Sequence, residues 1–247
     1  MPQYKKNYLT KVIFRIDFHQ IELGQLKTFA ETLKKDFPIL EEEKGEEGRI
    51  DFDFKTKKFK QSANFITQWI FYDKNRLKKI HIHPRFLYIE YYKYKNFDAL
   101  IFDVQHIIEF IKHFKIKTIN KAGLRHVNEI ELPGTDFLQW DGYINTKLIN
   151  SLKFTYKGNG KILRYMGQII FQENFGPINF NYGLWNSSYP NEINEKKFVL
   201  DFDAQSKFPL DTEGINLEEL VREYNEKIEK LFENAIGKKL KKIIYDK

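Results

Sequence analysis

Three pairs of potential metal ligands, each with its members two residues apart, are the first candidates for chemistry in the sequence. His81 and His83 form one pair, and two Asp-Phe-Asp stretches, Asp51–Asp53 and Asp201–Asp203, supply the others. Residues two apart on a β-strand share one face, so each pair can approach one divalent cation, as in metal-dependent nucleases. The alternative is structural: the aspartates form the wet face of a strand whose other face buries the phenylalanine. We favour this alternative and predict neither a metal nor a cofactor.

A weak internal repeat brings two arginines into equivalent positions. Residues 12–23 recur loosely as 122–132, and with one gap Arg15 aligns with Arg125. Together with His126, these arginines are candidates for a polar cluster between the two copies, where a guanidinium can bind a phosphate or carboxylate through two hydrogen bonds. The alternative is that each arginine pairs with a carboxylate of its own sheet, from Asp17, Glu129 or Glu131.

Positive charge is concentrated in the middle of the chain. The formal net charge is +7, and residues 55–125 contain 16 Lys or Arg against 5 Asp or Glu. Within this segment Tyr92, Lys93 and Lys95 combine aromatic and cationic side chains, which together can stack unpaired bases and contact phosphates. The alternative is a solvated basic face with ordinary aromatic sheet packing. Nucleic acid is therefore a candidate partner.

Other features limit the class of protein. The 247 residues include no cysteine, which rules out disulfides, thiolate metal sites and thiol nucleophiles. No glycine-rich phosphate loop, GxSxG elbow or HExxH motif is present, so an enzyme is not indicated. No apolar run approaches the ~18 residues that span a bilayer, and we expect a cytoplasmic protein with no membrane contact. An acidic stretch over 41–47 is expected to form a turn.

Hydrophobic periodicity predicts the order of the secondary structure. Period-two alternation over 10–18 predicts a half-buried strand, and helical spacing over 23–37 predicts a helix. Asn96 or Asp98 is placed to cap the clearest amphipathic helix of the chain. The remaining elements are expected as strands over 50–54, 63–73, 77–83, 85–94, 117–131, 151–157, 161–172, 178–186 and 196–205, with helical turns in 137–149 and a last helix over 216–245.

Short turns between consecutive strands imply antiparallel pairing, because parallel neighbours need a crossover of a dozen residues or more. We therefore predict an α+β fold made of a duplicated β-α-β-meander-α unit, with antiparallel sheets and helices packed on one face. The halves are residues 1–116 and 117–247, packed as one body because no Pro/Gly/Ser-rich linker separates them. In the last helix, apolar residues continue past Gly237, so that end must be covered by the second sheet or by another chain.

Four stretches carry a resemblance to a known family: residues 4–18, 37–43, 85–90 and 123–128. They resemble the sporadically distributed, uncharacterised prokaryotic proteins catalogued under that description. The family usually has a tyrosine where His126 stands. Its patchy distribution implies mobile genes such as phage-defence cargo, including loci near CRISPR systems, and it provides no established catalytic residues to transfer.

Three functions are compatible with these features. The first is a non-enzymatic component that docks a protein partner, with self-association as a further option. The second is an RNA- or single-stranded-DNA-binding protein that uses the basic segment 55–125. The third is a metal-dependent nuclease in which strand neighbours bring Asp51, Asp53, His81 and His83 together.

Overall fold

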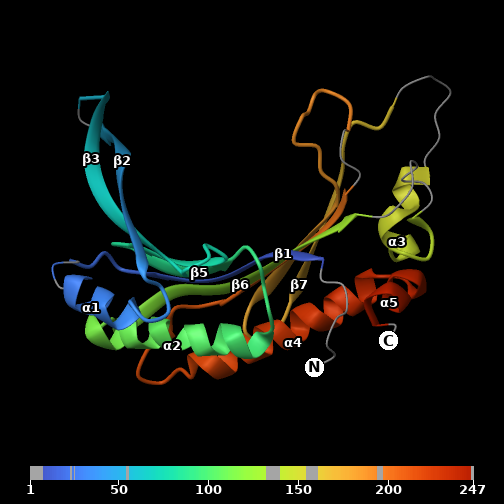
Figure 1. Ribbon diagram of the computed structural model, residues 1–247. Coiled ribbons are helices and arrows are strands. Elements are labelled where there is room, and N and C mark those ends of the chain that lie inside the picture. Colours follow the sequence, from blue (N-terminus) through green and yellow to red (C-terminus); the bar gives the residue numbers. More distant parts are fainter. Residues whose placement is uncertain are drawn as a thin grey trace.

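The fold is organised around one large sheet. The computed structural model describes residues 8–22, 24, 26–53, 56–131, 140–153, 161–193 and 197–245. Within these residues ten strands form a single antiparallel sheet, which confirms the α+β class and the antiparallel pairing (Figure 1). The strands are β1 (Leu9–Phe18), β2 (Ile39–Asp53), β3 (Lys58–Tyr72), β4 (Lys78–His83), β5 (Phe86–Tyr91), β6 (Thr118–Glu131), β7 (Tyr165–Gln172), β8 (Pro177–Leu184), β9 (Lys197–Gln205) and β10 (Leu210–Asp211).

The strand order places β1 and β6 side by side in the middle of the sheet. The order is β2-β3-β4-β5-β1-β6-β9-β8-β7, with the short β10 paired to β6. At the β1–β6 pair Phe14 stands opposite Leu124, Ile13 opposite Arg125 and Arg15 opposite Gly123. Strands from 1–116 and from 117–247 therefore belong to the same sheet, joined through this central pair.

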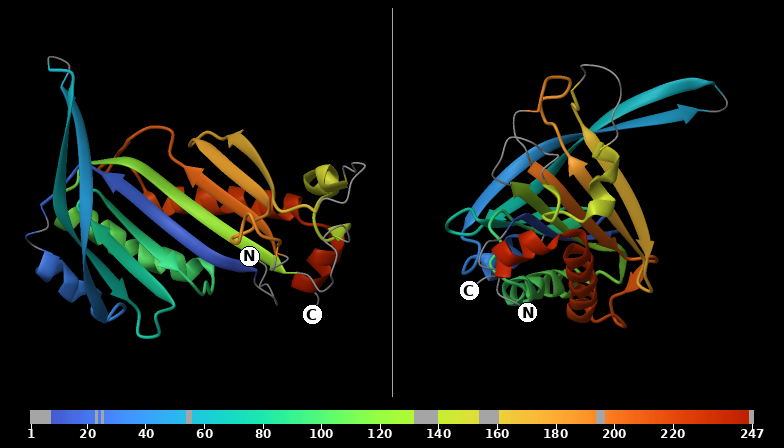
Figure 2. Two further views of the ribbon diagram at one scale, coloured as in Figure 1. Left: turned by 90° about the horizontal axis from the view of Figure 1, so that it is seen from above. Right: turned by 90° about the vertical axis from the view of Figure 1, so that its right-hand side faces the viewer.

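Three helices cover one side of the sheet. They are α1 (Leu26–Leu33), α2 (Phe97–His113) and α4 (Leu217–Ala235), and the hydrophobic core lies between them and the strands (Figure 1). The period-two alternation of β1 sends four buried side chains into this core: Val12, Phe14, Ile16 and Phe18. On the other side the sheet is concave, because β2 and β3 rise at one end and the strands of the second half rise at the other (Figures 1 and 2).

The predicted cap of α2 is confirmed. The Asn96 side chain accepts a hydrogen bond from the backbone N–H of Ala99 at 3.0 Å, which satisfies one of the free donors of the first turn. The helix ends at His113, where the Phe114 N–H donates to the carbonyl oxygen of Phe110. Of the helices in the described ranges, none combines the length and apolar character needed to cross a bilayer.

The sequence predicts a turn over the acidic stretch 41–47. In the structure this stretch is part of β2 instead. This strand pairs with β3 without interruption from Ile39 opposite Tyr72 to Asp53 opposite Lys58. The glutamates are compatible with a strand because Glu42, Glu43 and Glu46 are exposed, so that these charged side chains stay in water. The chain reverses only beyond Asp53, so the predicted strand 50–54 is the outer end of a longer one.

The second half departs from prediction before β7. The helical turns expected in 137–149 include α3 (Thr146–Ile149). Of the strand expected over 151–157, residues 151–153 instead belong to a 3-10 helix (Asn150–Lys153), and residues 154–157 lie outside the described residues. Residues 161–164 precede β7 and are not strand. The sequence also predicts a strand break at Pro133-Gly134 and a turn at Gly158–Gly160, and both lie outside the described residues.

The single helix predicted over 216–245 is two helices, α4 and α5 (Lys238–Tyr245). Ile236 between them is extended and bridges to Ile144, and the Gly237 N–H donates to the carbonyl oxygen of Tyr143 at 2.7 Å. A Cβ on residue 237 would overlap the carbonyl oxygen of Gly142, so glycine allows this close approach. The apolar residues past the break, Leu240 and Ile244, are buried within the chain.

Candidate functional site

The face of the sheet opposite the helices, here called the concave face, is polar over its central strands. Strand neighbours share a face, so the residues that alternate with the core positions of β1, β4, β5, β6 and β9 all project to this side. Cross-strand pairs such as Arg15 with Tyr88 and Tyr88 with His81 define it. Its main members are Lys11, Ile13, Arg15, Asp17, Lys79, His81, His83, Phe86, Tyr88, Glu90, Lys121, Gly123, Arg125, Val127, Glu129, Lys197, Val199, Asp201 and Asp203.

Arg15 and Arg125 lie on the concave face on either side of the central strand pair. Because Arg15 stands opposite Gly123, Arg125 is its diagonal neighbour, at a separation of about 7–8 Å between backbones. The Arg15 guanidinium donates to Asp17, with Nε at 2.9 Å and Nη2 at 2.6 Å, and lies 4.1 Å from the ring centre of Phe86. The structure thus brings the two arginines to one surface, with Arg15 held by Asp17 as the structural alternative predicted.

The partner of Arg125 is Asp201 on β9, not Glu129 or Glu131. Nε and Nη2 of Arg125 each donate to one carboxylate oxygen of Asp201 at 2.8 Å, a bidentate arrangement. This hydrogen bonding raises the pKa of Arg125, and the Asp201 side chain is almost fully buried beneath it. Asp203 lies two residues beyond Asp201 on the same strand. Burial raises the pKa of Asp203, which accepts a hydrogen bond from Gln205.

His126 does not join the arginines, contrary to the predicted Arg15–Arg125–His126 cluster. Adjacent residues of a strand point to opposite faces, so His126 projects toward the helices while Arg125 projects to the concave face. The His126 ring is buried 6.0 Å from the ring centre of Tyr94, and burial lowers its pKa to about 3. It is a neutral core residue.

A carboxylate between two lysines lies on the β5 side of the same face. Glu90 is buried, with Lys11 Nζ and Lys79 Nζ each 3.1 Å from its oxygens. Burial by itself would raise the pKa of Glu90, but hydrogen bonds from Lys79 and Lys11 lower it below its ordinary value. The pKa of Lys79 is raised by its bonds to Tyr92 and Glu90 against the opposing effect of burial. Tyr92, one of the predicted binding residues, thus belongs to this cluster.

The basic segment 55–125 does not present one cationic surface. Lys93 and Lys95 are exposed beyond the end of β5, whereas Tyr91 and Tyr94 turn toward the core. Lys78 lies beneath the sheet and Lys79 on the concave face, because adjacent strand residues face opposite ways. Sequence counting could not detect this division, since it depends on which face each strand position occupies.

His81 and His83 both contact other side chains of the sheet. The ring nitrogens of His81 lie 2.8 Å from the Tyr88 hydroxyl and 2.9 Å from Oε1 of Gln68, and burial together with Lys79 lowers its pKa to about 4. The His83 ring stacks on Phe86 with ring centres 4.3 Å apart. Across the part of the chain that the structure describes, no group of three or more His, Asp or Glu is placed to hold a metal.

The predicted nuclease constellation is also not assembled. Asp51 and Asp53 occupy β2 positions opposite Lys60 and Lys58, near the outer end of the hairpin. His81 pairs instead with Ile70, ten residues along β3 from Lys60, which is a separation of about 33 Å. The third candidate function therefore lacks its proposed site.

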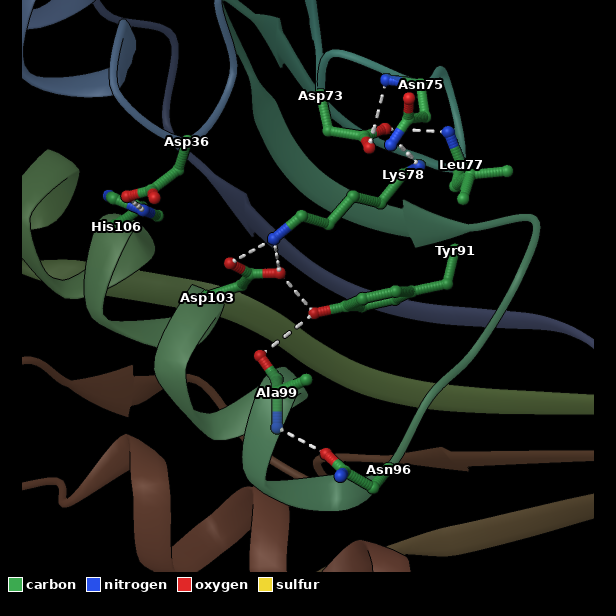
Figure 3. Close-up of polar contacts among 10 residues, drawn as sticks. All are labelled: Asp36, Asp73, Asn75, Leu77, Lys78, Tyr91, Asn96, Ala99, Asp103 and His106. Atoms are coloured by element: carbon green, nitrogen blue, oxygen red, sulfur yellow. Dashed lines mark hydrogen bonds and ion pairs between the residues drawn. The ribbon is translucent and has the colours of Figure 1, made fainter.

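A second polar cluster lies under the sheet and was not predicted from the sequence. The fully buried Asp103 of α2 has both carboxylate oxygens 2.7 Å from Lys78 Nζ and also accepts a hydrogen bond from the Tyr91 hydroxyl (Figure 3). Burial, with Asp103 close by, raises the pKa of Tyr91. The Tyr91 oxygen also lies 3.2 Å from the carbonyl oxygen of Ala99. This cluster ties α2 to β4 and β5 and has a structural role.

The comparisons with known proteins identify no family for this chain. No family model matches the chain, and no curated protein matches it.

Proposed function

We propose that the protein is a cytoplasmic, non-enzymatic binding component that holds a protein partner on the concave face of its sheet. The observation that carries this proposal is the pairing of opposite charges across that face. Arg15 contacts Asp17, Arg125 contacts Asp201, and Glu90 lies between two lysines, while Lys197 Nζ is 3.4 Å from Glu129. The face is thus polar but balanced in charge.

A balanced face suits a protein better than a nucleic acid. Binding to a phosphate backbone depends on cations that replace its counterions, and cations already paired with carboxylates contribute little to that exchange. A protein surface instead offers carbonyls, carboxylates and amides. The side chains of Arg15 and Arg125 remain 45% and 42% exposed, so each can donate further hydrogen bonds to such groups.

RNA or single-stranded DNA is the second candidate partner. One observation favours it: Tyr92, Lys93 and Lys95 are exposed together where the chain leaves β5. Binding at this place would use base stacking and phosphate contacts, and it would weaken steeply as salt is added.

We also infer that residues 1–116 and 117–247 are two copies of one unit. A shift of 110 residues along the sequence superimposes Arg15 on Arg125. The same shift converts the cross-strand pair Ile13–Arg125 into the pair Gly123–Arg15. The register of β1 with β6 therefore has two-fold symmetry about Phe14 and Leu124. Outward from the centre, β5 and β9, β4 and β8, and β3 and β7 occupy matching places. Each copy then contributes one arginine to the concave face.

We further propose a role in a prokaryotic defence system, CRISPR-linked or otherwise, on the basis of the sequence resemblance.

The test is a quantitative pull-down from the native host after nuclease treatment. The double variant Arg15→Ala/Lys121→Glu alters the concave face at exposed positions. The control, Lys230→Ala/Lys112→Glu, makes the same change in charge on helices of the opposite side. We expect the wild type and the control to recover a stoichiometric protein that the concave-face variant loses. Equal recovery by all three, or recovery of nucleic acid alone from untreated lysate, would contradict the proposal.

A further inference from the structure

Strand β7 forms one of the two edges of the sheet. The strand order ends at β7, and within the described residues this strand pairs with β8 alone (Figure 2). The pairing is continuous from Tyr165 opposite Leu184 to Gln172 opposite Pro177, with no bulge to interrupt it. An edge of this kind presents a row of backbone N–H and C=O groups to which a further strand can bind.

The outward backbone groups of β7 belong to every second residue. In the turn that joins β7 to β8, Glu173 and Gly176 exchange both backbone hydrogen bonds, at 3.0 and 3.2 Å. Hydrogen-bonded and non-hydrogen-bonded pairs alternate along an antiparallel ladder, so Met166, Gln168 and Ile170 occupy non-hydrogen-bonded pairs with β8. Their N–H and C=O groups therefore point away from β8, toward the open edge.

This edge lacks the features by which sheets avoid edge-to-edge association. Its eight residues, YMGQIIFQ, include no charged residue and no proline. Met166 is 50% exposed and Ile170 is 60% exposed. At the opposite edge, by contrast, β2 carries exposed glutamates that include Glu42 and Glu46. Charged side chains on an edge strand discourage the pairing of a second strand, so β2 is protected and β7 is not.

We propose that a second copy of this chain pairs its β7 with this edge, antiparallel about a two-fold axis that passes through Gln168 perpendicular to the sheet. Outward backbone groups then meet outward backbone groups: Met166 stands opposite Ile170 of the other copy, and Gln168 stands opposite its own counterpart. A two-fold pair brings residues near its axis close to their own copies, where a charged side chain would repel its counterpart. The uncharged β7 satisfies this requirement for a second copy.

The side chains of β7 are also complementary to themselves on the helix side of the sheet. The same axis places Tyr165 opposite Phe171 of the other copy and Gly167 opposite Ile169, so apolar residues meet apolar residues. An axis shifted by one residue would instead place Gln168 opposite an isoleucine. A two-fold interface requires a surface that matches itself, and β7 does so on both faces about one axis.

The size of the contact predicts a weak and reversible dimer. Three pairs of outward residues exchange about six backbone hydrogen bonds. Eight strand residues are about 27 Å long, and a contact about 10 Å deep along them buries roughly 300 Å² per chain, or about 600 Å² in total. This is well below the roughly 1,200–2,000 Å² of stable interfaces, so dissociation constants of about 10 µM or above are expected. Because the paired strands carry no charge, the association should change little with salt.

Sedimentation velocity at about 10 to 500 µM protein tests the proposal through the residue on the axis. Gln168→Lys and Gln168→Glu each place two like charges opposite each other and should weaken self-association by about fivefold or more. An equimolar mixture of the two variants should form a heterodimer at least as well as the wild type forms its homodimer. Gln20→Lys and Gln20→Glu, at an exposed position beyond the end of β1, are the matched controls and should dimerise like the wild type.

Single cysteines test the register, since the chain has none of its own. The thiols of Gln168→Cys would face each other with Cα atoms about 5.5 Å apart, within the range that a disulfide spans. Oxidation with diamide should therefore link them into a covalent dimer. Met166→Cys and Ile170→Cys place each thiol about 13 Å from its own copy, so these variants should be linked only when they are mixed.

A wild-type chain that stays monomeric up to the highest concentration would overturn the proposal and leave an extended segment of another protein as the occupant of this edge. A mixture of Gln168→Lys and Gln168→Glu that associates no better than each one does alone would also overturn it. So would covalent dimers that form equally from all three cysteine variants and from the control Gln20→Cys, because this would show random collision rather than a paired strand.

Discussion

Arg125 and Asp201 form the one bidentate ion pair that we identify on the concave face, with both N–O distances at 2.8 Å across the β6–β9 pair. The aspartate side chain is buried, whereas the arginine is partly exposed to solvent. The carboxylate therefore depends on the guanidinium to compensate for lost hydration. This dependence makes the pair a sensitive probe of the face on which we place partner binding.

Arg125→Ala should destabilise the fold by about 1–3 kcal/mol, because it leaves a buried carboxylate without its partner. The double variant Arg125→Ala/Asp201→Ala removes the unpaired charge as well and should recover most of this loss. Urea denaturation of the wild type, the two single variants Arg125→Ala and Asp201→Ala, and the double variant measures the coupling. Full additivity would show that the two side chains do not stabilise each other.

Stability should fall as the pH drops from about 7 toward 4. The pKa values of His81 and His126 are lowered to about 4 and about 3 from 6.5, so below pH 6.5 the unfolded chain binds protons that the folded chain does not. The contribution of each histidine is complete above pH 6.5 and is lost toward its folded pKa, at up to about 1.4 kcal/mol per pH unit. Urea denaturation at a series of pH values measures the slope. His126→Gln and His81→Gln should each reduce it.

Tyr91→Phe should destabilise the fold by about 1–3 kcal/mol, because the buried Asp103 loses a hydrogen-bond donor (Figure 3). The neighbouring residue provides a matched control. Tyr92→Phe removes a hydroxyl from a side chain that is 43% exposed on the other face, and its effect should stay within about 0.5 kcal/mol. Equal effects of the two substitutions would contradict the structural role of the buried cluster.

Removal of α5 by truncation after Ile236 should lower the melting temperature, because Leu240 and Ile244 are buried within the same chain. Leu240→Ala/Ile244→Ala should reproduce most of the loss, at about 2–5 kcal/mol for each residue. Ile243→Ala, at a partly exposed position on the same helix, is the control and should cost much less. Truncation after Asn216 also removes α4 and should abolish cooperative unfolding in thermal denaturation. An unchanged melting temperature in that shorter chain would mean that α4 is peripheral.

Much of the local structure could be predicted from the sequence. The alternation of Val12, Phe14, Ile16 and Phe18 identifies β1 because burial on one face of a strand imposes a period of two. Asn96 identifies the start of α2 because its side chain can accept a hydrogen bond from the first turn. The opposite orientations of Arg125 and His126 follow from the same alternation, because the two residues are adjacent on a strand that the sequence predicts.

Other features depend on contacts between distant segments and required the tertiary structure. The glutamates of 41–47 form a strand because β3 supplies their backbone partners, although no alternation of apolar and polar residues marks this stretch. The helix break at Gly237 occurs because Gly142, almost a hundred residues earlier, lies against the backbone there. Several carboxylates were available to Arg125; the β6–β9 register places Asp203 opposite it and Asp201 on the diagonal, and the guanidinium bonds the diagonal one. Local spacing determines which side chains share a face, but only the pairing of strands determines which faces and charges meet.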